Sequence, residues 1–167
     1  LCVLTGSFSM FAGISAAEAT PLCYAGGQGY GNSWNMTIGQ TFAYPGTGSV
    51  TLGYRYQTEA EPGYDYLNVA IDTTGSGGQD DVLITSYTGN IGSSLASHNL
   101  APGTLMRSDA GNVTIKFNAT SDGAYSDEDG AYVTVCGHSS IDDISLSGAI
   151  THSTDFEAGD GGWVAII

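Results

Sequence analysis

Alternation of apolar and polar residues is clearest in Val50-Thr51-Leu52-Gly53-Tyr54-Arg55-Tyr56-Gln57. Every second residue in this stretch is large and apolar, and the residues between are small or polar. Side chains of a β-strand point alternately to opposite faces of a sheet, so the pattern predicts a strand with one buried face. Tyr54 and Tyr56 fall on that face, and we expect them to pack in the core.

The same period of two continues on both sides of this stretch. Leu67, Val69 and Ile71 mark a strand within 64–72, and Val113, Ile115 and Phe117 mark another. Further strands are expected at 36–44, 82–87, 131–135 and 140–146, with loops at 59–63, 73–79, 90–94 and 121–130. Such a series without an amphipathic helix predicts an all-β fold, an antiparallel β-sandwich of jelly-roll-like topology.

Composition limits the partners of the chain. Its 167 residues suffice for one sandwich domain, and its 25 glycines suit strands joined by tight turns. Three basic residues against 17 acidic ones give a formal net charge of −14. Because binding to phosphate depends on Lys and Arg, this charge excludes nucleic acid as a partner. The acidic excess indicates either a soluble, salt-adapted surface or a site for Ca²⁺, which prefers oxygen ligands.

The ends of the chain differ from its middle. Leu1 to Ile14 is mostly apolar, no charge precedes Glu18, and Ala17-Glu18-Ala19 follows, which is typical of a signal peptidase site. We therefore expect a signal-peptide remnant at 1–19, a sandwich at 20–148, and a linker with the beginning of another module at 149–167. A buried strand or helix at 1–14 is the alternative. The apolar run is too short to span a membrane. Because of the signal peptidase site, the protein is expected to be secreted or at the cell surface.

Three cysteines occur, of which Cys2 lies in the predicted signal segment. Its removal would leave Cys23 and Cys136 as an even pair in an oxidising compartment, where a disulfide is expected. Two unpaired buried thiols are the alternative.

Several phrases together resemble a jelly-roll family of secreted bacterial proteins, which includes domains of immune-inhibitor-A-type metallopeptidases, and are similar to MAM-type and carbohydrate-binding-module sandwiches. The phrases are Gly29-Tyr30-Gly31-Asn32-Ser33-Trp34, Tyr54-Arg55-Tyr56, Glu61-Pro62-Gly63-Tyr64-Asp65-Tyr66, residues 120–130, Cys136-Gly137, Ile141-Asp142-Asp143-Ile144, and the tail phrases Asp155-Phe156-Glu157 and Gly162-Trp163. The resemblance implies a non-catalytic accessory domain with a structural Ca²⁺ near the paired aspartates Asp142 and Asp143.

The distribution of acidic residues also suggests calcium. Four lie in one short loop, where their mutual repulsion favours a bound cation: Asp122, Asp127, Glu128 and Asp129. A second group, Glu59, Glu61 and Asp65, flanks the Pro62-Gly63 turn. Solvated loop acids are the alternative for each group.

Motifs for catalysis do not occur. None of the three histidines belongs to a His-Glu-x-x-His sequence, and no serine belongs to Gly-x-Ser-x-Gly. Aromatic residues beside turns could instead stack on a sugar or anchor a protein, and the candidates are Tyr30, Trp34, Tyr64 and Tyr125.

The sequence therefore predicts a non-catalytic extracellular binding or adhesion module, stabilised by Ca²⁺. It would be part of a larger secreted or surface protein and contact other domains of the same polypeptide, with a glycan or an extracellular protein as its ligand. The alternatives are an accessory domain of a secreted metallopeptidase and a structural subunit of a surface layer or filament.

Overall fold

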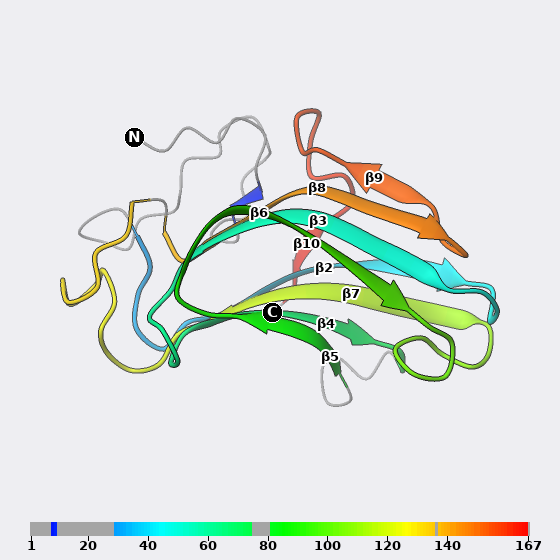
Figure 1. The fold of residues 1–167 in the computed structure, drawn as a ribbon, viewed down its shortest axis with the longest axis horizontal. Helices are drawn as coiled ribbons and strands as arrows, with labels where there is room; N and C mark the ends of the chain where they lie inside the picture. The colour runs from blue at the N-terminus through cyan, green and yellow to red at the C-terminus, as the bar shows by residue number, and fades with distance from the viewer. Residues whose placement is uncertain (1–7, 10–28, 75–80, 136, 167) are drawn as a thin grey trace.

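Two antiparallel β-sheets pack face to face in the computed structural model, which describes residues 8–9, 29–74, 81–135 and 137–166 (Figure 1). The strands are β1 (Phe8–Ser9), β2 (Asn35–Tyr44), β3 (Val50–Glu59), β4 (Tyr66–Asp72), β5 (Val82–Tyr87), β6 (Asn90–Leu100), β7 (Gly111–Thr120), β8 (Ser139–Gly148), β9 (His152–Thr154) and β10 (Val164–Ile166). The predicted antiparallel β-sandwich is confirmed.

The order of the strands is that of a jelly roll. One sheet runs β1-β8-β3-β6, with β9 also paired to β8, and the other runs β10-β2-β7-β4-β5. Strands β1 to β8 thus divide into 1-8-3-6 and 2-7-4-5, so that early and late strands of the chain lie side by side in each sheet. Such an arrangement is built from two Greek keys.

Apolar side chains from the inner faces of both sheets form one core. Leu52 and Tyr54 of β3 meet Val69 and Ile71 of β4 and Phe117 of β7, and all five are at most 2 % exposed. Full burial of one such side chain contributes about 1.5–3 kcal/mol. The prediction that Tyr54 and Tyr56 face the core is confirmed, since Tyr56 packs against the same cluster.

The loop predicted at 90–94 is wrong, because those residues begin the eleven-residue strand β6. The alternation of apolar and polar residues is interrupted here by Gly92, Ser93 and Ser94. These residues are tolerated because β6 lies at the edge of its sheet and pairs only with β3. Leu100 is the one residue of β6 that is fully buried.

The strand predicted at 131–135 is also wrong. The side chains of Val133 and Val135 in this segment are both exposed. Backbone N–H groups of this segment donate to carboxylates rather than to a neighbouring strand. The N–H of Thr134 donates to Oδ1 of Asp127 at 2.7 Å, and the N–H of Val135 donates to Oε2 of Glu59. Backbone donors satisfied in this way do not need a sheet.

The segment after Gly148 differs from the expected linker and second module. Its strand β9 pairs with β8, and β10 pairs with β2, so the segment extends both sheets (Figure 1). Phe156 and Trp163 are each 1 % exposed and belong to the core cluster. The Trp163 ring lies 5.3 Å from that of Phe117, so the tail fills part of the sandwich interior.

Some predictions lie on residues outside the described ranges. Cys23 and Cys136 are among them, and their disulfide stays a prediction. Phe8 and Ser9, within the predicted signal segment, pair with Ile141 and Ser140 of β8, and cleavage after Ala19 also stays a prediction. Among the described residues, no helix is long and apolar enough to cross a bilayer.

Candidate metal centre

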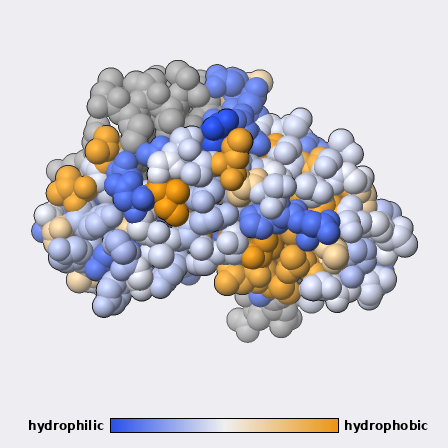
Figure 2. Space-filling model, in the orientation of Figure 1, coloured by the Kyte–Doolittle hydropathy of each residue, from blue (hydrophilic) through white to orange (hydrophobic). Residues whose placement is uncertain are grey.

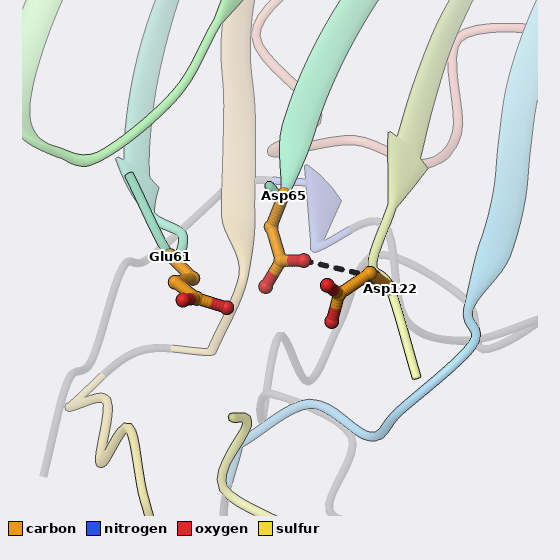
Figure 3. Close-up of side chains that lie close together, drawn as sticks. All are labelled: Glu61, Asp65 and Asp122. Carbon is orange, nitrogen blue, oxygen red and sulfur yellow. Dashed lines mark hydrogen bonds between the residues drawn. The ribbon is translucent and has the colours of Figure 1, made fainter. Parts of the chain in front are cut away.

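The pairing of β4 with β7 brings two acidic segments together. These strands are antiparallel, with Tyr66 opposite Thr120, so the residues before β4 lie beside the residues after β7. Asp65 and Asp122 occupy these two positions. The N–H of Asp122 donates to Oδ1 of Asp65 at 2.9 Å, which links the two segments directly (Figure 3).

A tight turn places Glu61 at the same point. The N–H groups of Tyr64 and Asp65 donate to the carbonyl oxygen of Glu61 at 3.3 and 3.1 Å. The hydroxyl of Thr88 donates to that carbonyl at 3.1 Å and accepts from the N–H of Gly63 at 2.8 Å. These four bonds fix the turn, so the position of the Glu61 backbone is determined.

Glu61, Asp65 and Asp122 form the group that we call the acidic triad. One carboxylate oxygen from each lies within 4.8 Å of the other two, and among the described residues this is the group of His, Cys, Asp or Glu side chains close enough to share a metal ion. Figure 3 shows the three carboxylates gathered at the ends of their segments. Glu61 is partly buried, Asp65 is buried and Asp122 is exposed, so the triad opens to solvent on one side.

Asp65 is held on both of its oxygens. Besides the bond from Asp122, the hydroxyl of Tyr30 donates to Oδ2 of Asp65 at 2.6 Å. Burial and this bond to a carboxylate raise the pKa of Tyr30 well above its ordinary value, so the phenol stays a donor. A carboxylate oxygen has two lone pairs, and each Asp65 oxygen therefore retains one for a further ligand.

Negative charge accumulates at this end of the molecule. Partial burial, together with the neighbouring carboxylates of Asp122, Asp65 and Asp129, raises the pKa of Glu61. The three Lys and Arg residues of the chain form their ion pairs elsewhere: Arg55 with Asp143, Arg107 with Asp109, and Lys116 with Asp72 and Asp81. None of these ion pairs includes a member of the triad.

The triad fits the chemistry of Ca²⁺. Calcium–oxygen distances are about 2.3–2.6 Å, so two ligands on opposite sides of one ion are separated by about 5 Å. A mutual separation within 4.8 Å allows all three oxygens to contact one ion. Calcium takes six to eight oxygens in flexible geometry, and water can complete the set on the exposed side.

Of the predicted metal ligands in the loop 121–130, only Asp122 belongs to the triad. Asp127 is buried and accepts from the N–H of Tyr30 at 3.0 Å and from the hydroxyl of Thr134 at 2.7 Å. The N–H of Asn32 donates to Glu128 at 2.8 Å. These carboxylates tie the loop to the segment before β2.

Asp129 has a similar role within its own loop. Its carboxylate accepts from the N–H groups of Ala131, Tyr125 and Ser126 at 3.0, 2.6 and 3.1 Å. The bonds from Ala131 and Tyr125 are the main causes that lower the pKa of Asp129. The carboxylate therefore organises the loop in its ionised form.

Asp142 and Asp143 lie apart from the triad, on β8. Asp142 is opposite Arg55 in the register between β8 and β3, and Oδ2 of Asp143 accepts from Nε of Arg55 at 2.9 Å. The structure thus gives Asp143 a guanidinium partner, and it does not bring this pair of aspartates together with the other predicted ligands.

The four aromatic residues predicted to form a ligand surface have different environments. Tyr30 is completely buried, which corrects its assignment to a surface. Trp34 is half-buried and packs edge-on against Tyr30 at 6.3 Å. Tyr64 and Tyr125 are 62 % and 51 % exposed and lie on the two loops that supply the triad.

Sequence reasoning missed the support behind Asp65. His138 is completely buried, its ring lies 5.0 Å from that of Tyr30, and its Nε2–H donates to the carbonyl oxygen of Thr120 at 3.0 Å. Burial lowers the pKa of His138 and favours the neutral ring. The buried group formed by Tyr30, Asp65 and His138 joins three distant parts of the chain, and no local pattern signals it.

Comparison with known proteins finds no protein family whose model matches this chain, and no curated protein matches it.

Proposed function

We propose that this chain is a non-catalytic extracellular binding or adhesion module that is stabilised by Ca²⁺ at the acidic triad. The observation that carries the proposal is the convergence of three carboxylates within 4.8 Å at an end of the fold where no Lys or Arg pairs with them. A divalent cation would offset their repulsion and would hold the loop after β7 against the turn before β4.

The surface around the triad supports a binding role. Among the described residues, seven large apolar side chains are exposed, and four of them lie on these two loops: Tyr64, Tyr125, Val133 and Val135. Exposed tyrosines are common at ligand and protein contacts, because the ring supplies apolar area and the hydroxyl a hydrogen bond. A glycan or an extracellular protein would contact this end of the module, and a bound cation would determine the positions of the two loops.

Binding to a glycan array and to immobilised extracellular-matrix proteins, in Ca²⁺ and in EDTA, tests this function. We expect binding that depends on Ca²⁺ and falls at least tenfold in a Tyr64→Ala/Tyr125→Ala variant. Leu83→Ala is the matched control, because Leu83 is 56 % exposed on β5 and belongs to neither loop of the triad. Figure 2 shows an apolar patch on the part of this face where Figure 1 places β5. Equal binding in EDTA, equal binding by the double variant, or no binding to either class of ligand would contradict the proposal.

A further inference from the structure

Three buried polar atoms have no hydrogen-bond partner among the described residues in the region where the tail closes the sandwich. They are Oε1 of Gln40, Nε2 of His152 and Nε1 of Trp163. A buried polar group without a partner costs about 1–3 kcal/mol. Three such atoms from three separate segments therefore require an explanation.

The register of the strands places Gln40 and Trp163 side by side. Val164 of β10 is opposite Gly39 of β2, so the preceding Trp163 is opposite Gln40, on the same face of the sheet. Gly162 has φ +89°, and a Cβ there would lie 2.5 Å from Nε2 of Gln40. The absence of a side chain at Gly162 thus lets the Gln40 amide lie against this turn.

His152 reaches the same region from the opposite sheet. It is paired with the buried Leu146, so its side chain faces the interior. Its ring lies 5.3 Å from that of Phe42, and the Trp163 ring lies 6.4 Å from the same phenyl group. Gln40 and Phe42 are two residues apart on β2 and share its inner face. The side chains of Gln40, His152 and Trp163 therefore all lie next to Phe42, between β9 and the β2–β10 pair.

We propose that Gln40, His152 and Trp163 bind one internal water molecule. None of the three atoms bonds directly to another, and a water between them satisfies all three. Its oxygen accepts from the indole N–H of Trp163, which can only donate, and its two hydrogens go to Oε1 of Gln40 and to Nε2 of His152. Three hydrogen bonds are usual for a buried water. This water links β9 of one sheet to β2 and to the residue before β10 of the other.

Proton NMR of the native protein tests the site directly. The chain has two tryptophans, and a Trp34→Phe variant identifies which indole signal belongs to Trp163. We expect a cross-relaxation peak between the Trp163 indole proton and water, with the sign of a long-lived bound molecule. Absence of this peak at an indole proton protected from exchange would show that the region is dry and would overturn the proposal.

A double-mutant cycle supplies an independent measurement. Gln40→Met and Trp163→Phe each remove one partner of the water and retain most of the side-chain volume, and each is expected to raise the unfolding equilibrium constant about tenfold. If both partners hold one water, the double variant loses less than the product of the single effects, by at least about threefold. Effects that multiply independently would contradict a shared water.

Discussion

The hydroxyl of Tyr30 donates a 2.6 Å hydrogen bond to Oδ2 of Asp65 and so connects the segment before β2 to the residue before β4. Both residues are completely buried, and the same hydroxyl accepts from the N–H of Glu61 at 3.3 Å. Two members of the acidic triad therefore depend on one phenol for their position.

Tyr30→Phe removes this donor and preserves the ring. Because a buried carboxylate loses a hydrogen bond, we expect the free energy of unfolding to fall by about 1–3 kcal/mol in urea denaturation. Tyr64→Phe is the control, since the Tyr64 ring is 62 % exposed, and it should change stability by less than about 0.5 kcal/mol. Equal losses in the two variants would contradict the role assigned to Tyr30.

Acid should destabilise the protein through two histidines. Burial lowers the pKa of His138 and of His98 below the ordinary value of 6.5. At a pH near 6.5 the two histidines therefore bind protons more readily in the unfolded chain than in the folded one. The free energy of unfolding should fall as the pH decreases from about 7 through 6.5 toward the lower pKa values of the folded state.

A stability profile from pH 7.5 to 5.5 measures this effect, and His98→Gln should flatten it. Nε2 of His98 lies 3.0 Å from the hydroxyl of Tyr54, and a glutamine amide can occupy that position without titrating. If the profiles of the variant and the native protein are parallel, the titration of His98 does not contribute to the pH dependence of stability.

Glu61 has the opposite effect on stability. Its pKa is raised in the fold, so its ionisation destabilises the fold as the pH rises above about 4.5.

Two ion pairs should differ in their contribution to stability. The side chains of Lys116 and Asp72 are 6 % and 4 % exposed, with Nζ 3.6 Å from Oδ2, whereas those of Arg55 and Asp143 are 42 % and 47 % exposed. Removal of a buried cation from beside carboxylates is costly, so Lys116→Met should reduce the free energy of unfolding by about 3–5 kcal/mol. Arg55→Met should reduce it by less than about 1 kcal/mol. Denaturation curves showing the reverse order would refute this assignment.

The tail should contribute to the core of the sandwich. Phe156 is 1 % exposed, and Phe156→Ala should lower the free energy of unfolding by about 3–5 kcal/mol, as for other buried aromatic residues. Val164 is 56 % exposed on the neighbouring strand β10, and Val164→Ala should cost less than about 1 kcal/mol. A Phe156→Ala variant as stable as the native protein would support the separate module that the sequence suggested.

Much of the sandwich could be predicted from its sequence because its central strands alternate cleanly. Val113, Ile115 and Phe117 of β7 all enter the core, as their period of two indicates. The edge strand β6 was missed because a strand with one neighbour needs few apolar residues, and Gly92 and Ser93 resemble a loop.

Only part of the acidic triad could be predicted from the sequence, for a different reason. Asp65 and Asp122 were recognised as members of two separate acidic groups, but their meeting depends on the β4–β7 register, which no local pattern gives. The position of the tail does not follow from the sequence, because Phe156 and Trp163 belong to a phrase that resembles the beginning of a module. Only the pairing of β10 with β2 shows that they fill this core.

Thermal melting in Ca²⁺ and in EDTA tests the central claim most directly. At a Ca²⁺ concentration a hundredfold above Kd, binding adds about 2.7 kcal/mol, which raises Tm by about 5–10 °C for a chain of this size. Asp122→Asn keeps the side-chain oxygen that accepts from Ala124 but removes a ligand charge, and it should lose most of the shift. Asp143→Asn, at the Arg55 pair, should keep it. A native Tm that is the same in Ca²⁺ and in EDTA would contradict a calcium-stabilised module.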